Sequence, residues 1–334
     1  MTLLMRNNSP SRIRIFWLLA CLLVLSSCAS TPQSRLILAE PPASLPEAIE
    51  LVETPFYPQL KYQCGPAALA TVLEFRGDKT SIEELSREIY IPARKGSLQI
   101  EMTAAARRHG MLPYKLAPQL LDLLTEVAAG NPVLVFQNLS FEWYPMWHYA
   151  VVIGYDISKQ EIVLRSGTTR RWVTTFEVFE RTWQRADWWA LVLVPAGAIP
   201  KTAKPQPYLK TAFAFEETGR TELALSAYRS ATRQWPGVTD SWLTLGNMAF
   251  KKQYWEEAIA AFITATTIQP SLPVSRNNLA YALHDAGCIT QAQQALECGL
   301  RIAPADENLQ DSLHDLKTRA VSSKLLECLQ ITCY

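Results

Sequence analysis

The hydrophobic pattern is helical in the early part of the chain and strand-like after it. Helical segments are predicted after Pro66, after Ser81 or Thr80, over residues 99–109 and over residues 119–128. Strand-type runs then occupy residues 132–137, 148–155, 161–165, 172–175 and 188–194. Helices followed by strands, without βαβ alternation, predict an α+β domain with an antiparallel sheet over residues 51–195.

Beyond residue 195 the pattern becomes helical and repeats itself. Residues 195–207 contain four prolines among small and basic residues, which predicts a linker over residues 196–207. Pro236, Pro270 and Pro304 then follow at a spacing of 34. This period resembles the tetratricopeptide repeat, a helix–turn–helix unit that stacks into a superhelix. The resemblance implies an all-α solenoid of three repeats over residues 208–305, with a capping helix and tail over residues 306–334.

The N-terminus has the pattern of a secretory leader. Arginines precede an apolar run over residues 15–25, and small residues stand directly before Cys28. This resembles the lipobox of bacterial lipoproteins, which implies a signal peptide over residues 1–27 and a lipid anchor on Cys28. Because Ala29 rather than Asp follows, the resemblance also implies the periplasmic face of the outer membrane. An ordinary signal peptide or an uncleaved anchor is the alternative. Residues 28–50 have no sustained period and predict a tether.

Charge and cysteine content narrow the range of partners. The chain of 334 residues has a formal charge of +1, and loss of the three leader arginines leaves about −2, so electrostatics give no reason to expect nucleic acid.

Four of the seven cysteines lie near the C-terminus, which predicts one or two disulfides in an oxidising compartment. They are Cys288, Cys298, Cys328 and Cys333, and their pairing stays open. Without a CxxC motif, and with four histidines, we expect no metal site and no cofactor.

Cys64 and His148 are the candidates for chemistry. Cys64 stands at the start of the buried helix, where the helix dipole is expected to lower the pKa of a thiol. His148 opens a strand and follows an aromatic loop over residues 143–147. A cysteine on a helix start and a histidine on a distant strand are what thiol catalysis requires. The imidazole takes the thiol proton and later protonates the leaving amine.

The surrounding residues resemble one peptidase family over roughly residues 50–195. The resemblance is carried by Gln59, by Cys64-Gly65-Pro66-Ala67-Ala68-Leu69-Ala70 and by His148-Tyr149-Ala150-Val151-Val152-Ile153-Gly154-Tyr155-Asp156. These segments look like the bacteriocin-processing (double-glycine leader) peptidases, which are papain-like in fold. The resemblance implies that Cys64 is the nucleophile, His148 the base and acid, and Gln59 a donor to the oxyanion. Gln63 is the alternative donor.

The third member of the catalytic set departs from the family pattern. The family has an acid or amide on the strand after the histidine, whereas antiparallel pairing here places Ser166 to Thr168 opposite His148. We therefore expect Ser166 to orient the imidazole, with Asn138 as another candidate. The interpretation is a cysteine peptidase that hydrolyses a peptide or protein. The alternatives are a catalytically weak or inactive scaffold and a thiol acyltransferase that uses the same pair.

The repeats predict a groove for a protein partner. Counting within the repeat unit places Asn247 and Lys251 on the concave face, together with Asn277 and Tyr281. Amide and ammonium groups there suit a peptide backbone or a carboxylate. We therefore expect the repeat domain to recruit a protein.

Overall fold

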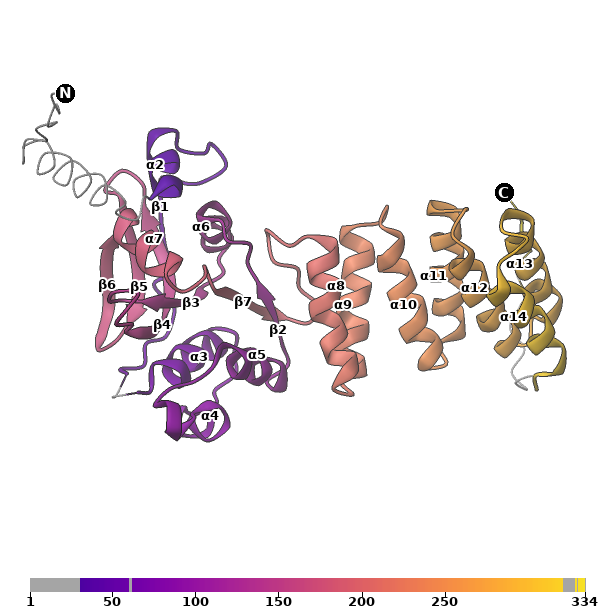
Figure 1. Cartoon of the computed structure of the whole chain (residues 1–334), viewed down its shortest axis with the longest axis horizontal. Coiled ribbons are helices and arrows are strands. Elements are labelled where there is room, and N and C mark those ends of the chain that lie inside the picture. Colours follow the sequence, from indigo (N-terminus) through magenta and orange to yellow (C-terminus); the bar gives the residue numbers. More distant parts are fainter. Residues whose placement is uncertain (1–30, 60–61, 321–327, 329, 334) are drawn as a thin grey trace, which may run out of the picture.

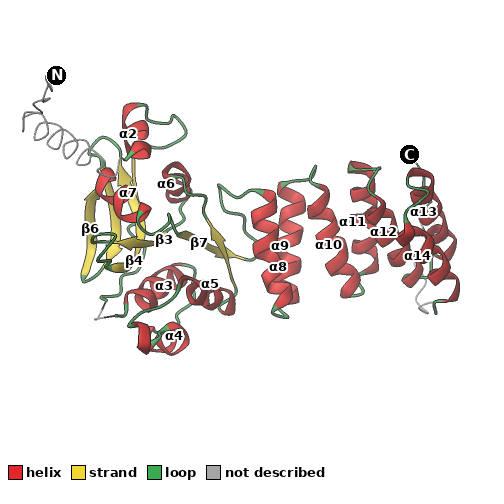
Figure 2. Cartoon of the chain, viewed as in Figure 1, coloured by secondary structure: helices red, strands yellow, loops and turns green. Residues whose placement is uncertain are grey.

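The computed structural model describes residues 31–59, 62–320, 328 and 330–333, and it has two parts (Figure 1). Helices surround a sheet in the first part, and the second part is a row of helices (Figure 2). The predicted α+β domain followed by an all-α solenoid is confirmed. The predicted signal peptide, residues 1–27, and the predicted lipidation site Cys28 lie outside the described residues. Among the helices that are described, none has the length and apolar character needed to cross a membrane.

The sheet is antiparallel throughout. Its strand order is β2-β7-β3-β4-β5-β6, and β1 pairs with the far end of β4. The strands are β1 (Ala48–Glu50), β2 (Met111–Lys115), β3 (Val133–Asn138), β4 (Trp147–Asp156), β5 (Glu161–Ser166), β6 (Thr169–Thr175) and β7 (Ala190–Pro195). The five predicted strands correspond to β3 to β7. The sequence pattern did not reveal β1 and β2.

Helices cover both faces of this sheet (Figure 1). One face carries α3 (Cys64–Phe75), α4 (Ile82–Ile89) and α5 (Gln99–Arg108), and the other carries α2 (Pro32–Ala39), α6 (Leu120–Ala128) and α7 (Phe176–Gln184). Residues 65–73 of α3 are all buried, as the apolar run predicts. Ser81 caps α4 and forms a capping box with Glu84, which confirms the predicted helix start. Sequence reasoning missed α7, although Phe176, Phe179 and Trp183 are buried at a helical spacing.

The predicted tether is corrected for residues 32–50, which pack against the domain. Pro32 begins α2, where a helix tolerates proline, and Ile37 is buried against the core. The fully buried Glu180 of α7 accepts hydrogen bonds from the backbone N–H groups of Gln33 (3.1 Å) and Ser34 (2.6 Å). A carboxylate at a helix N-terminus satisfies N–H groups that have no acceptor within the helix. A contact between residues so distant in sequence leaves no trace in the local pattern.

The second part of the molecule consists of three helical pairs and a final helix. The helices are α8 (Pro205–Glu217), α9 (Thr221–Gln234), α10 (Thr239–Lys251), α11 (Trp255–Ile268), α12 (Pro273–Asp285), α13 (Ile289–Ile302) and α14 (Glu307–Thr318). A Cβ on Gly246 of α10 would come 2.5 Å from the Phe262 ring of α11, so the two helices can approach only at glycine. The final helix α14 packs on α12 and α13.

The predicted linker is also corrected, because residues 196–204 are packed between the two parts. Ala196 is buried, and its carbonyl accepts a hydrogen bond from the Tyr208 hydroxyl at 3.3 Å. Ser230 Oγ donates to the Gly197 carbonyl at 2.8 Å. One apolar core therefore runs from the sheet into α8 and α9. The small residues that suggested a flexible spacer fit instead into a close contact.

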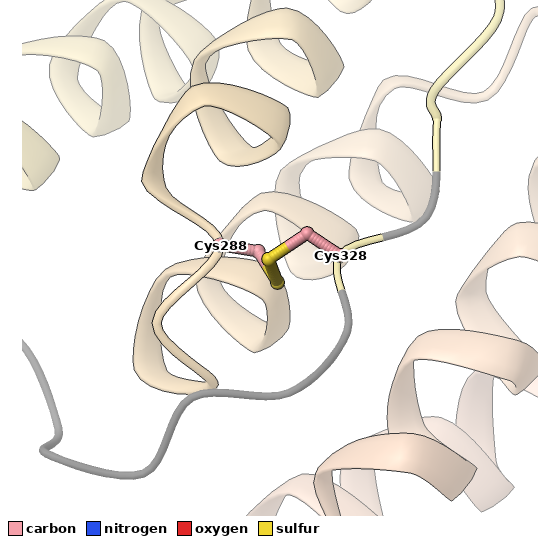
Figure 3. The surroundings of a disulfide bond; sticks show 2 residues. All are labelled: Cys288 and Cys328. Atoms are coloured by element: carbon pink, nitrogen blue, oxygen red, sulfur yellow. A yellow bond between two sulfur atoms is a disulfide. The ribbon is translucent and has the colours of Figure 1, made fainter.

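Two disulfides fasten the C-terminal tail to the last helical pair. Cys288 bonds to Cys328, and Cys298 bonds to Cys333. Figure 3 shows the first of these beside the turn that precedes α13. The sequence predicted one or two disulfides among these four cysteines, and the structure gives the pairing. Cys64 is the free cysteine of the described residues.

Candidate active site

Cys64 is the first residue of α3 and is half-buried. A Cβ on Gly65 would come 2.7 Å from Ser97 Oγ, so the start of α3 lies tightly against the loop before α5. Burial raises the pKa of the Cys64 thiol, and hydrogen bonds from the backbone N–H groups of Tyr149, Gly65 and Cys64 oppose that shift. The predicted lowering of this pKa is therefore wrong. Desolvation of the thiolate outweighs the effect of the helix N-terminus.

The backbone of Tyr149 interacts with two predicted site residues, Cys64 and Gln59. Pairing between β4 and β5 extends only as far as Val151, so Tyr149 lies beyond it on β4. The Tyr149 N–H favours the thiolate form of Cys64 and so opposes the rise in its pKa. The Tyr149 carbonyl accepts a hydrogen bond from Gln59 Nε2 at 3.4 Å. The Gln59 backbone is fixed in turn by its N–H, which donates to the Gly167 carbonyl at 3.0 Å.

His148 lies against Ser166, where the predicted strand pairing places it. His148 Nε2 is 2.9 Å from Ser166 Oγ. Gln137 stands opposite His148 on β3, and its amide donates to Thr182 Oγ1 of α7 at 2.7 Å. Side chains alternate along a strand, so the imidazole faces α7 while Tyr149 faces α3. Nδ1 of His148 has no hydrogen-bond partner among the described residues.

Both candidate groups, the Cys64 thiol and the His148 imidazole, are neutral near pH 7. Burial lowers the pKa of His148 to about 4, since an imidazolium would lose hydration there. Burial raises the pKa of Cys64. Within the part of the chain that the structure describes, no hydrogen bond joins Cys64 to His148. The structure thus brings Gln59 to the Tyr149 carbonyl and His148 to Ser166, and it holds a neutral thiol and a neutral imidazole instead of an ion pair.

Two cavities lie on the two sides of β4. The cavity at Cys64 has a volume of about 610 Å³ and contains the charged groups of Arg94, Lys95 and Asp187. The cavity at His148 and Ser166 has a volume of about 430 Å³. Its lining, as far as the structure describes it, includes hydroxyl groups and apolar side chains but no Asp, Glu, Lys or Arg. The acid that the family pattern expects near the imidazole is therefore missing from this lining.

Asn138 organises the aromatic loop and does not orient His148. Its Oδ1 accepts hydrogen bonds from the backbone N–H groups of Ser140 (3.0 Å) and Met146 (2.9 Å), and its Nδ2 donates to the Phe141 carbonyl (3.2 Å). These three bonds engage the buried amide, so Asn138 is corrected as a candidate. The loop that it holds exposes the aromatic side chains of Phe141, Trp143 and Tyr144.

Gln63 is the N-cap residue of α3 and lines neither cavity. Gln59, on the Tyr149 backbone, is the better placed of the two candidate donors. Sequence reasoning missed the Tyr149 backbone, because residue spacing does not mark a backbone group. It also missed the 3₁₀ turn (Pro92–Arg94) beside the Cys64 cavity. Pro92 and Gly96, which mark turns in a sequence, are the signal that would have located it.

The predicted groove residues make contacts within the solenoid itself. Most of these contacts join residues 34 or 35 positions apart on the inner helices α8, α10, α12 and α14. They are Asn277–Ser312 (2.7 Å), Tyr281–Asp315 (3.0 Å), Lys251–Glu216 (3.4 Å) and, at a shorter separation, Asn247–Asn278 (2.9 Å). The side chains therefore hold neighbouring repeats together. Their contact with a partner stays a prediction.

Fold and site together define a cysteine-peptidase-like α+β domain joined to a helical-repeat solenoid. The model of the family described as the Peptidase_C39 like family matches residues 51–188. These residues form a C39-like peptidase domain, which confirms the resemblance seen around Gln59, Cys64 and His148.

Several solved structures are similar to parts of this chain. A putative C39-like peptidase from Bacillus anthracis has 19% sequence identity and a TM-score of 0.39, covering 47% of this chain and 100% of that one. The peptidase domain of Streptococcus ComA, described as a bi-functional ABC transporter involved in a quorum sensing pathway, has 19% identity and a TM-score of 0.35, covering 43% and 99%. The Yersinia enterocolitica type III secretion translocator chaperone SycD has 14% identity and a TM-score of 0.33, covering 35% and 96%. No curated protein matches the chain.

Proposed function

We propose that this protein is a cysteine peptidase that cleaves a peptide bond through an acyl-enzyme on Cys64. The observation that carries the proposal is the 2.9 Å contact between His148 Nε2 and Ser166 Oγ, which leaves Nδ1 as the base nitrogen. The backbone N–H of Tyr149, the residue that follows His148, favours the thiolate form of Cys64 and so opposes the rise in its pKa. Cys64 at the start of α3 and His148 on β4 are the groups that we assign as nucleophile and base.

The chemistry starts from the neutral pair. His148 Nδ1 takes the thiol proton as the sulfur attacks the carbonyl carbon, so that a C–S bond forms and the carbonyl oxygen becomes an oxyanion. The C–N bond then breaks, and the imidazolium gives its proton to the leaving amine. Water hydrolyses the thioester with His148 acting again as the base. Gln59 Nε2 and the Cys64 backbone N–H are the donors that we assign to the oxyanion.

The pair is tested by the rate at which iodoacetamide modifies Cys64, measured by mass spectrometry of the Cys64 peptide. We expect His148→Ala to slow the reaction by about tenfold or more, because the thiol then loses its base. His314→Ala, at an exposed position of α14, is the matched control and is expected to leave the rate unchanged. Equal rates in wild type and His148→Ala would refute the activated pair.

Gln59 is tested separately by acyl transfer. We expect Gln59→Ala to reduce the p-nitrophenolate burst rate with p-nitrophenyl acetate by about a hundredfold, since one oxyanion donor is lost. Alkylation by iodoacetamide forms no oxyanion and should keep its rate. Gln63→Ala is the matched control, and a larger loss in that variant would transfer the donor role to Gln63.

We also propose that the protein is anchored by lipid on Cys28 and faces the periplasm from the outer membrane. The two C-terminal disulfides support an oxidising compartment, and small residues precede Cys28. We expect Cys28→Ala to lose both incorporation of labelled palmitate and membrane sedimentation. Cys21→Ala, within the apolar run, should keep both; palmitate labelling that survives Cys28→Ala would contradict the anchor.

The solenoid is proposed to recruit a protein partner along its inner helices. Support comes from its stack of three helical pairs, an architecture that presents an extended surface. Co-purification with the full chain should identify the partner. Lys251→Ala is expected to weaken that association more than Lys317→Ala on α14, and equal retention would remove Lys251 from the contact.

A non-catalytic scaffold is the second candidate. It is favoured by the absence of a carboxylate from the lining around His148 among the described residues. A thiol acyltransferase would share the first half of the reaction. Added glycinamide separates the two enzymes, because a transferase yields the acylated amine whereas a peptidase yields the acid.

A further inference from the structure

The loop between β3 and β4, residues 139–146, exposes a cluster of large apolar side chains. Trp143 is 81% exposed and Phe141 is 60% exposed, and their rings stack with centroids 5.5 Å apart. The exposed apolar side chains of the loop and of the first residue of β4 are Leu139, Phe141, Trp143, Tyr144, Met146 and Trp147. Contiguous apolar surface of this kind marks a site of interaction, because its contact with water is unfavourable.

The polar backbone groups of this loop have partners within the protein. Asn138 binds three of them, as described above, and the Tyr144 N–H donates to the Phe141 carbonyl at 3.2 Å. Arg185, directly after α7, donates to the Ser140 carbonyl at 2.8 Å. Lipid offers no hydrogen-bond partner to a backbone that enters it, so such groups must be satisfied internally. The loop meets this condition for these groups while its rings stay exposed.

The composition of this surface favours a membrane as its occupant. Trp and Tyr concentrate where lipid meets water, because each combines an apolar ring with one polar group. Glu142 is the only charged residue of the loop, and it is exposed.

A pair of basic residues lies next to the aromatic side chains. Arg94 and Lys95 line the Cys64 cavity together with Met146, and Asp187 is the one acid in the described lining. Within the described residues, neither Arg94 nor Lys95 forms an ion pair with a carboxylate. Exposed basic groups beside an apolar surface attract anionic lipid headgroups.

The start of the described chain lies close to this loop. Glu180 of α7 accepts a hydrogen bond from the Gln33 N–H, and Arg185, five residues further along, donates to Ser140. Five residues of helix rise about 7.5 Å, and Figure 1 shows α2 beside α7. The chain from Gln33 back to Cys28 spans at most about 18 Å. The proposed lipid anchor on Cys28 and the loop can therefore meet the same membrane.

We propose that the β3–β4 loop docks on a lipid bilayer, with its aromatic side chains at the level of the headgroups and with Arg94 and Lys95 facing anionic lipid. The contact rests on the proposed membrane location of the protein, and it does not depend on the proposed peptidase activity. Because Met146 lines the Cys64 cavity, docking places that cavity beside the lipid surface.

Vesicle binding is measured with protein that begins at residue 29, which keeps every described residue and removes the leader and Cys28. The protein is sedimented with vesicles of phosphatidylcholine, with or without phosphatidylglycerol. We expect Trp143→Ser to weaken binding about tenfold, because the most exposed ring no longer enters the interface. Phe213→Ser, at an exposed position of α8, is the control and should bind as the wild type does. No binding by the wild type, or equal binding by Trp143→Ser, overturns the proposal.

The basic pair is tested by the dependence of binding on lipid charge. The double variant Arg94→Gln with Lys95→Gln should lose the preference for phosphatidylglycerol and should bind pure phosphatidylcholine unchanged, since only the anionic lipid attracts these groups. The control is Lys115→Gln with Lys201→Gln, at exposed positions outside the cavity lining, and it should keep the preference. A preference that survives in the first double variant overturns the assignment of Arg94 and Lys95 to the contact.

Insertion is measured by the quenching of tryptophan fluorescence with dibrominated phosphatidylcholine. Trp143→Phe keeps an apolar ring, and so keeps binding, but it removes one fluorophore. We expect this variant to lose a large part of the quenching seen in the wild type, because the Trp143 ring lies among the lipids. Trp255→Phe removes a fluorophore from α11 of the solenoid and should lose none of the quenching. Equal quenching in the wild type and in Trp143→Phe overturns the insertion of the loop.

A soluble apolar peptide is the competing occupant of this surface. The probe is an acetylated tetrapeptide of alternating alanine and leucine, and its binding is measured by calorimetry. If it binds the wild type but not Trp143→Ser, and neither protein sediments with vesicles, the surface belongs to a peptide and the lipid proposal is overturned.

The failure of the anchor and the failure of the loop contact are distinguishable. If Cys28→Ala keeps its palmitate label while the protein from residue 29 binds vesicles, the anchor fails and the loop contact stands. If palmitate labelling depends on Cys28 but the protein from residue 29 binds no vesicles, the loop contact fails alone. Alkylation of Cys64 tests the peptidase proposal independently of both.

Discussion

The repeat solenoid and the peptidase domain position their polar side chains in different ways. In the solenoid, polar contacts recur between equivalent positions of neighbouring helices, as in Tyr281–Asp315 and Asp285–Arg319, each 34 residues apart. In the peptidase domain, His148 meets Ser166 across a hairpin, and Gln59 reaches the Tyr149 carbonyl across 90 residues. The solenoid contacts follow from its 34-residue period, whereas the contacts in the peptidase domain depend on how the strands of the whole sheet pair.

The two regions also differ in whether their polar groups are satisfied, which bears on where the functional site lies. The inner polar residues of the solenoid connect neighbouring repeats and so contribute to its stability. The site around Tyr149 contains groups without such an explanation. Gln59 Oε1 is buried without a hydrogen-bond partner among the described residues, and burial shifts the pKa values of both Cys64 and His148. Changes at the site should therefore alter reactivity, and changes in the solenoid should alter stability.

Replacement of the nucleophile has the largest expected effect. Cys64→Ala should reduce the p-nitrophenyl acetate burst by about a thousandfold or more, because no acyl-enzyme can form. The urea midpoint of the solenoid, followed by its helical circular dichroism, should stay unchanged. Cys64→Ser keeps the size of the side chain and is the control for folding. A burst that survives Cys64→Ala would move the chemistry to another residue.

Acid should weaken the peptidase domain through His148. The unfolded imidazole binds a proton near pH 6.5, whereas burial lowers the pKa in the folded protein to about 4. Between these values the unfolded state binds more protons, so stability is fully present above pH 6.5 and is lost as the pH falls through 4. The difference amounts to about 3 kcal/mol. The measurement is the free energy of unfolding as a function of pH, in the wild type and in His148→Gln. The difference between the two proteins should grow as the pH falls. Parallel curves for the two proteins would contradict the prediction.

The next prediction concerns the solenoid, where Gly246 of α10 lies tightly against Phe262 of α11. Gly246→Ala should destabilise the repeats by about 2 kcal/mol, because the new methyl group overlaps the Phe262 ring and must displace it. Gly237→Ala is the matched control, since a Cβ there meets no atom within 4 Å. Alkylation of Cys64 should stay the same in both variants. A stable Gly246→Ala protein would mean that the ring moves aside at little cost.

Much of the fold follows from periodicity, and the exceptions have a physical cause. The apolar run of residues 67–73 and the prolines 34 residues apart locate α3 and the helical pairs, because each element shows its burial in its own sequence. The segment at residues 32–39 does not. It becomes a docked helix through Glu180, far away in the chain.

The sequence predicted which residues form the site better than it predicted their pKa values. Antiparallel pairing predicts that Ser166 to Thr168 lie opposite His148, and Ser166 is the residue that contacts the imidazole. The direction of the Cys64 pKa was mispredicted, because a helix N-terminus is visible in sequence while the depth of burial is not. Asn138 was misassigned for a similar reason. Its amide is used by a loop whose conformation the sequence does not fix.

The smallest expected effect concerns a helix cap that the sequence could have shown. Asp306 caps α14, where its side chain accepts a hydrogen bond from the Leu309 N–H at 3.0 Å. Asp306→Ala should cost about 1 kcal/mol, and Asp306→Asn should recover most of it, since an amide oxygen also caps well. Hydrogen exchange of the α14 amides measures the loss. Because α14 is the last of the inner helices, its fraying should leave the hydrogen exchange of the α3 amides unchanged. If the α3 amides also lose protection, the two parts of the molecule unfold as one unit through their shared core.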